Sequence, residues 1–251
     1  MTDNNLYQYI LGLADNSLIL GQRLGELCGH GPNLETDIAC TNISLDLIGQ
    51  TRSYYQYAAK LAGEGATEDG IAFLRLEREY RNVLLVEQPN RHFGFILGRQ
   101  FLFDVYHLMV LNELQNSSDE TLAAIAKKSV KEVSYHKRFS TDWVKRLGDG
   151  TEESNEKMQE AIDSLWRYTD ELFKPTESET AMALEGVGPD ITQFKEAYYN
   201  EVTAVLEEAN LTVPESKYFT HGGKNGVHSE HMGYLLSELQ YMQRTYPDMK
   251  W

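Results

Sequence analysis

Cysteine and proline are both scarce in this sequence. Its 251 residues include two cysteines, Cys28 and Cys40, and six prolines. Two cysteines within apolar helical patterns support neither a disulfide framework nor a zinc motif, and we expect two small buried thiols. Because proline is the strongest helix breaker, its scarcity favours a mostly helical globule. We predict one domain that covers residues 1–251.

Positive charge and long hydrophobic runs are also lacking. The chain has 23 lysines and arginines against 38 acidic residues, a formal net charge of −15. This balance argues against a nucleic-acid partner, because a phosphate backbone attracts lysine and arginine. We find no apolar run near the roughly 20 residues that span a bilayer, and no basic and apolar leader after Met1. We therefore expect a cytoplasmic protein without a membrane partner.

Apolar residues at spacings of three and four predict four long helices. The first two are joined by a short connection and should pack antiparallel, and Ser117-x-x-Glu120 reads as a capping box that opens the fourth. The predicted segments are Leu6 to Gly29, a second helix capped by Asn33 that ends at Gly63, Leu97 to Leu114, and Leu122 to Leu147.

The remaining segments complete a known topology. Residues 66–91 form a crossover, with a helix from Ile71 to Leu85 that Pro89 stops. Two antiparallel pairs joined by one long crossover are typical of the ferritin-like bundle. Further helices are predicted at 153–173, 191–209 and 229–246, with an extended loop at 211–226. The predicted fold class is all-α, a ferritin-like four-helix bundle with additional C-terminal helices.

Asp104-x-x-His107 and Glu132-x-x-x-His136 interrupt the apolar stripes of the third and fourth helices. In ferritin-like di-iron proteins, two helices each donate a carboxylate and two others each donate a Glu-x-x-His pair. The spacing of three places both ligands on one helical face. His136 stands four residues after Glu132, and His107 lies on a helix that needs only a carboxylate.

Both positions where a histidine ligand is expected hold another residue. Tyr135 stands three residues after Glu132, and Gly49 stands three residues after Asp46 on the second helix. The first helix offers only Asp15 at the matching level. The predicted remnant of a metal site therefore consists of Asp46, Gly49, Asp104, Glu132 and Tyr135, because first-row metals are held weakly without imidazole.

Three interpretations of these polar residues remain open. Asp104, His107, Glu132 and His136 could form a buried hydrogen-bonded network, hold a single labile metal, or build a true di-metal centre. The missing imidazoles favour the network, in which carboxylates pair with imidazoles. We expect Asp46 to be satisfied by Arg52 or by a neighbouring helix.

A glycine-rich string, Thr220-His-Gly-Gly-Lys-Asn-Gly-Val-His-Ser-Glu-His231, precedes the last helix. A structural loop or a contact between subunits is the favoured interpretation, since lone glycine-rich loops are weak signals. An anion site at Lys224 and a metal site at His228 and His231 are the alternatives.

Five mixed polar and apolar strings carry a resemblance along the whole chain. They are Arg23-Leu-Gly-Glu-Leu-Cys-Gly-His30, Asn42-Ile-Ser-Leu-Asp-Leu-Ile-Gly-Gln50, Leu84-Leu-Val-Glu-Gln-Pro-Asn90, Tyr135-His-Lys-Arg-Phe-Ser140 and Gly222-Gly-Lys-Asn-Gly-Val-His-Ser-Glu-His231. In this order they resemble the C-type subunits of the bacterial phenylacetyl-CoA epoxidases, which are multicomponent ferritin-like monooxygenases. The resemblance implies that a homologous A subunit holds the di-iron centre and binds the thioester. This chain would be its partner, with the same fold, a lost metal site and no cofactor of its own.

The resemblance gives two further segments a role beside a CoA ester. Glu79, Tyr80, Arg81 and Asn82 could stack on an adenine and pair with a phosphate, and a weaker candidate is the loop formed by Met182, Ala183 and Leu184. A solvated helical turn is the plainer interpretation of the first segment.

The expected function is that of a non-catalytic subunit that stabilises the catalytic subunit of a phenylacetyl-CoA epoxidase, with phenylacetyl-CoA bound in the complex. One alternative is a carboxylate-bridged di-metal oxygenase that uses Asp104, His107, Glu132 and His136. Another is a stand-alone, homodimeric acyl-CoA-binding module, and a homodimer of the isolated chain also stays open.

Overall fold

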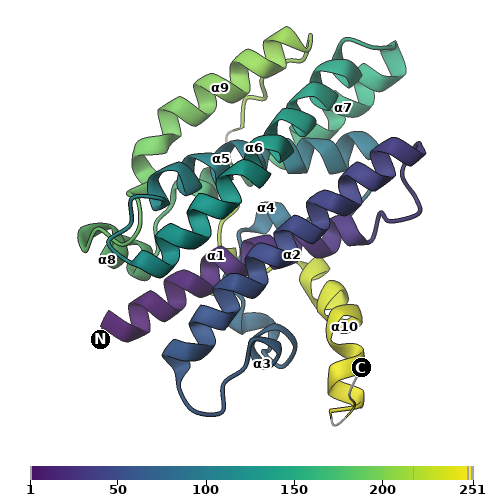
Figure 1. The fold of residues 1–251 in the computed structure, drawn as a ribbon. Helices are drawn as coiled ribbons and strands as arrows, with labels where there is room; N and C mark the ends of the chain where they lie inside the picture. The colour runs from purple at the N-terminus through teal and green to yellow at the C-terminus, as the bar shows by residue number, and fades with distance from the viewer. Residues whose placement is uncertain (1, 217, 248, 250–251) are drawn as a thin grey trace.

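The protein is a bundle of long helices with shorter helices around it, seen here in a computed structural model that describes residues 2–216, 218–247 and 249. Helices α1 (Thr2–Gly25), α2 (Leu34–Ala62), α5 (Phe93–Leu114) and α6 (Glu120–Gly148) form the bundle. In Figure 1, α1 packs along α2 and α5 along α6. The two pairs and the long crossover between them confirm the ferritin-like fold.

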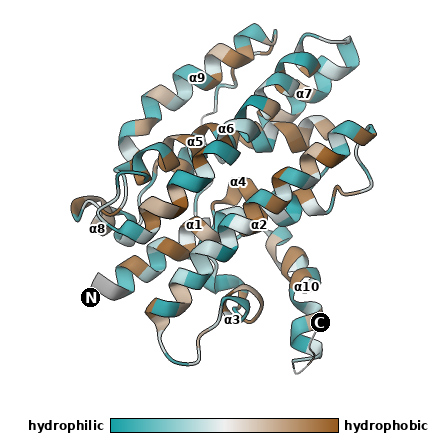
Figure 2. Ribbon diagram, viewed as in Figure 1, coloured by the Kyte–Doolittle hydropathy of each residue, from teal (hydrophilic) through white to brown (hydrophobic). Residues whose placement is uncertain are grey.

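Helix α5 is the central helix of the core. It packs against α6, α7 (Glu152–Trp166) and α9 (Lys195–Glu208), and Figure 2 shows it largely in hydrophobic colours. By length and composition it is the one helix among the described residues that could cross a membrane, so the prediction that no apolar run approaches that length was wrong. However, 89% of its apolar window is buried inside the protein, as is usual for a core helix.

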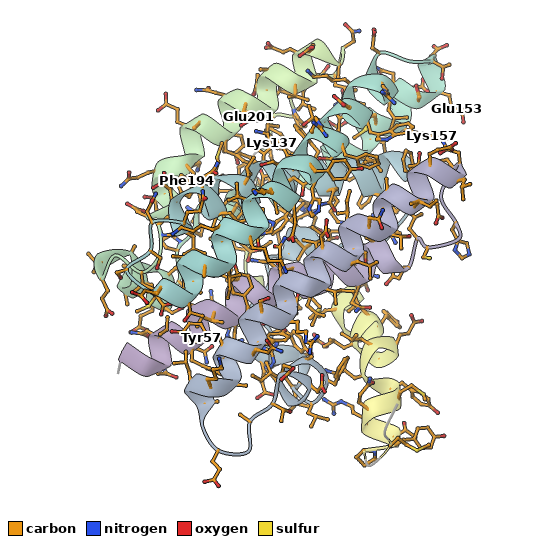
Figure 3. All side chains as sticks on the ribbon, viewed as in Figure 1. Tyr57, Lys137, Glu153, Lys157, Phe194 and Glu201 are labelled. Carbon is orange, nitrogen blue, oxygen red and sulfur yellow. The ribbon has the colours of Figure 1, made fainter. Side chains whose placement is uncertain are left out.

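The ends of three bundle helices test the predicted boundaries. Asn33 caps α2 as predicted, since its side chain accepts a hydrogen bond from the Thr36 amide at 2.9 Å. Asp119, and not Ser117, caps α6, and it also accepts a 2.5 Å hydrogen bond from Tyr57 of α2. Figure 3 labels Tyr57. Helix α1 ends at Gly25, four residues earlier than expected.

The turn after α1 also corrects the prediction for the cysteines. Cys40 is buried in α2, but Cys28 is exposed in this turn. Burial raises the pKa of the Cys40 thiol to about 12, so this thiol stays protonated and packs as a small apolar group.

The predicted helix from Ile71 to Leu85 was wrong. The crossover instead contains α3 (Glu68–Phe73), the short helix η1 (Glu77–Glu79) and α4 (Leu84–Glu87). Helix α1 replaces the missing intrahelical bonds, because the amide of Arg81 donates to Asp15 and the amide of Val83 donates to Asn16. Tertiary hydrogen bonds have therefore overridden an amphipathic pattern.

The C-terminal third contains α7, α8 (Glu177–Leu184), α9 and α10 (Glu230–Thr245), with short helices η2 (Asp170–Phe173), η3 (Ile191–Phe194) and η4 (Gly223–Asn225). Helix α9 lies beside α6, and an ion pair between Lys137 and Glu201 joins them (Figure 3). The helices predicted at 191–209 and 229–246 are confirmed, whereas the one predicted at 153–173 breaks after Trp166. Helix α10 extends away from the bundle and contacts α3 and η1 (Figure 1).

Candidate functional site

Asp15 of α1 is fully buried and has a complete set of partners. Arg75 from the crossover donates to both of its carboxylate oxygens, at 2.5 and 3.0 Å, and the Tyr55 hydroxyl donates at 2.5 Å. Burial, and then the charge of Asp15, raise the pKa of Tyr55 well above its usual value, so the hydroxyl keeps its proton. The sequence analysis identified Asp15 but missed Arg75, which lies 60 residues away.

Arg75 is itself held by two contacts with the crossover, a ring stacked on one face of its guanidinium and a hydrogen bond from its edge. Its guanidinium carbon lies 4.1 Å from the centroid of the Tyr80 ring, and its Nε donates to the Ile71 carbonyl at 2.7 Å. An arginine fixed in this way is a rigid counterion. Removing either Arg75 or Asp15 would leave the other charge buried without a partner, which is costly.

Asp46 of α2 and Glu132 of α6 each bind a side chain of the other helix. His136 Nε2 lies 3.0 Å from Asp46 Oδ2, and Gln50 Nε2 donates to Glu132 Oε2 at 3.1 Å. The expectation that a neighbouring helix satisfies Asp46 is therefore confirmed, and the alternative partner Arg52 instead lies near Glu68.

Asp104 lies on α5 and is fully buried. It accepts hydrogen bonds from Gln100 Nε2 at 2.7 Å and from Ser140 Oγ at 2.8 Å. Burial raises the pKa of Asp104 to about 7, although His136 and the two hydrogen bonds favour the ionised form. A carboxyl group with this pKa changes charge near neutral pH.

His107 does not join the network with Asp104. Its ring packs against Phe103 with centroids 5.1 Å apart, and neither of its nitrogens has a hydrogen-bond partner among the described residues. Burial, and then the charge of His136, lower the pKa of His107 to about 3, so the ring is neutral at physiological pH.

The two expected histidine positions, Tyr135 and Gly49, are not buried in the centre of the bundle. Tyr135 is 40% exposed, whereas the next residue, His136, is buried. Gly49 is half-buried, and a Cβ atom placed there would meet nothing within 4 Å. The inward-facing residues of α6 at this level are thus His136 and Ser140, one helical turn apart.

These side chains do not fit a di-iron centre. Among the described residues, no group of three or more His, Cys, Asp and Glu side chains is placed to hold a metal ion. The four acids Asp15, Asp46, Asp104 and Glu132, called the bundle carboxylates below, each have a protein partner: Arg75, His136, Ser140 and Gln50. The bundle carboxylates therefore form hydrogen bonds and ion pairs inside the protein, and their oxygens are engaged by these side chains.

The glycine-rich string forms a loop packed closely against the crossover. Gly226 has a φ of +77°, and a Cβ atom on Gly223 or Gly226 would collide with the backbone at Asn82 or Arg78. Glycine is therefore required where the two backbones touch. The interpretation as a structural loop matches this packing.

The charged residues of this loop are paired within the chain. Lys224 is 5% exposed and binds Glu179 Oε1 at 2.9 Å, which argues against an anion site. His228 Nδ1 lies 2.8 Å from the buried carboxylate of Glu87, which also accepts from the Ser229 amide, and His231 is half-buried with its carbonyl accepting from Arg23. These contacts describe loop anchors and not metal ligands.

Comparison with known proteins shows the family of this chain. The family model described as "Phenylacetic acid catabolic protein" matches residues 1–251. The chain belongs to this family. It is 49% identical over 248 residues, which cover 99% of this chain and 100% of the relative, to the C subunit of the 1,2-phenylacetyl-CoA epoxidase of Escherichia coli (strain K12).

The first of the two segments predicted to contact CoA is largely closed to a ligand. Tyr80 and Asn82 are fully buried and hydrogen-bonded inside the chain, so neither is open to a ligand. Glu79 is exposed and accepts from the Leu76 amide, while Arg81 is half-buried and donates to Gln8 at 3.2 Å. The alternative of a solvated helical turn was wrong for the two buried residues.

The second segment was wrongly expected to be a loop. Met182, Ala183 and Leu184 form the last turn of α8, where Met182 is fully buried and Leu184 is 85% exposed. Apolar residues at spacings of three and four did not predict this short helix. Its capping box, Thr176 and Glu179, is a sequence pattern that could have predicted where it begins.

Proposed function

We propose that this member of the phenylacetic acid catabolic family is a non-catalytic subunit of a phenylacetyl-CoA epoxidase. It forms a heteromer in the cytoplasm with a homologous A subunit, which holds the di-iron centre and binds phenylacetyl-CoA. The observation that carries the proposal is the pairing of the bundle carboxylates with protein side chains.

The pairing of Asp15 gives the strongest support. Arg75 places a positive charge within 3.0 Å of both carboxylate oxygens, at the level where a di-iron bundle needs free carboxylates. A metal cation would have to displace this guanidinium and leave it buried without a counterion, which costs several kcal/mol. The bundle has instead replaced metal ligation with an internal ion pair.

An exposed apolar stripe on α2 supports the heteromer. Leu34, Ile38, Leu45 and Ile48 are 71%, 50%, 60% and 37% exposed. At about 100° per residue the four side chains fall within about 80° of each other, so they line one face of the helix. Figure 2 shows hydrophobic stretches along this helix at the front of the molecule. Exposed apolar rows of this kind mark protein interfaces.

The charge around the stripe suits a protein partner. Arg52 continues the same helical face one turn beyond Ile48, and its side chain is 71% exposed. Apolar side chains bordered by an arginine are typical of interfaces, in which the apolar centre supplies affinity and the charged rim supplies register. A partner of the same fold would bring a second long helix to this face.

The proposal is tested by co-purification with the A subunit. The double variant Ile38→Glu, Leu45→Glu should lower the affinity by at least about tenfold, because each interface anchor contributes about 1 kcal/mol or more. Leu184→Glu is the matched control, since Leu184 is also an exposed leucine on a helix but lies on α8. It should bind like the unmodified chain.

Four results would contradict the proposal or its interface. Two irons per purified chain would support the di-metal oxygenase, as would epoxidation without a second subunit. Tight binding of acyl-CoA by a homodimer that ignores the A subunit would support the stand-alone module. Equal loss of binding in the Leu184→Glu control would show that α2 is not the interface.

A further inference from the structure

A cavity of about 270 Å³ lies between α1, α5, the beginning of α8 and η4. Its lining includes Tyr9 and Gly12 from α1, Phe103, Tyr106 and His107 from α5, and Lys224 from the loop, and we call it the aromatic cavity. It differs from the predicted metal level, because none of the bundle carboxylates lines it.

Two buried polar groups of the aromatic cavity have no partner among the described residues. The Tyr9 hydroxyl and His107 Nδ1 are buried without a hydrogen bond in the described part of the chain, and the Tyr106 hydroxyl forms none there either. Tyr9, Tyr106 and His107 are only 4%, 6% and 6% exposed. Buried polar groups are nearly always hydrogen-bonded, so two such unpartnered groups on one cavity, with the Tyr106 hydroxyl beside them, point to a binding partner from outside the chain.

The buried wall carries no unmatched charge. The pKa of His107, lowered to about 3 by burial, keeps its ring neutral. Lys224 is paired with Glu179, and Arg81 donates to Gln8 and to the carbonyls of Arg78 and Tyr80. Arg81 has no acidic partner in these contacts, but it is only half-buried, so a charged group placed against the buried Tyr9, Tyr106 and His107 would lose its hydration without gaining a counterion there, which is unfavourable. The cavity suits an uncharged ligand.

The shape of the cavity suits a flat ring. Rings from Tyr9, Phe103, Tyr106 and His107 supply surfaces that favour edge or offset stacking with an aromatic group. Gly12 leaves the α1 side open, because a Cβ atom there would approach only the Arg81 carbonyl, at 3.9 Å. A volume just below the usual range of about 300 to 1,000 Å³ limits the ligand to about one ring.

We propose that the aromatic cavity binds a small, uncharged aromatic molecule with a hydrogen-bonding substituent. The ring lies against the aromatic side chains, and the substituent bonds to the hydroxyls of Tyr9 and Tyr106 and to the imidazole of His107. This inference does not rest on the proposed function, since the cavity is complete within this chain.

The test is calorimetric titration of the full chain with phenol, benzamide and benzoate. Phenol and benzamide should bind the unmodified chain, and benzoate, a charged analogue of the same size, should bind at least about tenfold more weakly. Cyclohexanol should also bind more weakly than phenol, because it lacks a flat ring. No binding of phenol or benzamide at about 10 mM, or equal binding of benzoate, would overturn the proposal.

Two glycine variants locate the site. Gly12→Leu fills the cavity from a helical position without strain and should weaken phenol binding at least about tenfold. Gly49→Leu is the matched control, because Gly49 is also a helical glycine with open space but lies on α2. Equal binding to both variants would place phenol elsewhere on the protein and refute the assignment.

A third variant keeps the test decisive if Gly12→Leu does not fold, which circular dichroism would reveal. His107→Phe preserves an aromatic wall but removes the unpartnered nitrogens. Benzamide binding, which depends on hydrogen bonding, should weaken at least about fivefold in this variant. Unchanged binding would show that His107 does not contact the substituent.

Discussion

The bundle carboxylates and the aromatic cavity are two polar regions of the same bundle, and they are built in opposite ways. Each bundle carboxylate has a protein partner, as the pair of Asp15 and Arg75 illustrates. The cavity leaves the hydroxyl of Tyr9 and Nδ1 of His107 buried without one in the described structure. Paired polar groups stabilise the fold and resist change, whereas unpartnered ones reduce stability and leave room for a ligand. The comparison predicts that mutations in the two regions have different effects on stability.

Breaking the pair at Asp15 should have the largest effect. Arg75→Met leaves a buried carboxylate without a counterion and should lower the free energy of unfolding by about 3 to 5 kcal/mol, as measured by urea denaturation. Adding Asp15→Asn to this variant should recover a large part of the loss, because the buried charge is then gone. A loss below about 1 kcal/mol would show that Arg75 does not stabilise Asp15.

The protonation of Asp104 should make the stability of the protein depend on pH. Its pKa rises from 3.8 to about 7 on folding, so the native state binds the proton more tightly than the unfolded state. Stability is therefore lost as pH rises from about 4 to about 7. The variant Asp104→Asn does not show this loss. The difference in free energy of unfolding between the variant and the unmodified chain should therefore shift in favour of the variant by about 2 to 4 kcal/mol from about pH 5 to about pH 8.

The measurement is urea denaturation of both chains at the two ends of this pH range. The variant can keep both hydrogen bonds, because Ser140 can accept from the asparagine amide while donating to the Lys137 carbonyl, which already lies 3.2 Å away. A constant stability difference across this pH range would mean that Asp104 is ionised at both values.

The smallest effect is expected in the cavity. His107→Phe removes nitrogens that have no described partner, so the free energy of unfolding should change by less than about 1 kcal/mol or increase slightly. Ser140→Ala provides the contrast, since it deprives buried Asp104 of a donor and should cost about 1 to 3 kcal/mol. If both variants lost the same stability, the distinction between the two regions would fail.

Periodicity predicted the bundle well because each long helix carries its own apolar stripe and its own caps. The cap at Asn33, the bundle topology and the C-terminal helix at 229–246 followed from local patterns. The crossover failed for the opposite reason, since the amides of Arg81 and Val83 bond to α1 and not to their own helix. Pairing between residues so far apart in the chain leaves no periodic signal.

The candidate site shows the same division. Sequence spacing identified the missing imidazoles at Gly49 and Tyr135, and the polar character of Asp104 and His136. It could not show that Tyr135 faces outward, that His136 selects Asp46, or that His107 stands apart from Asp104. Those choices depend on how the helices are rotated against each other, and side-chain packing sets that rotation.

By itself, the sequence determined the helical class, the four long helices, the negative net charge and the absence of a histidine three residues after Asp46 and Glu132. These properties depend on residue type and on spacing along the chain. Only the tertiary structure decided which partner each buried carboxylate received, and it alone created the aromatic cavity. A buried polar group must find its partner in three dimensions, and the unpartnered Tyr9 hydroxyl and His107 Nδ1 share the cavity that we propose as a ligand site.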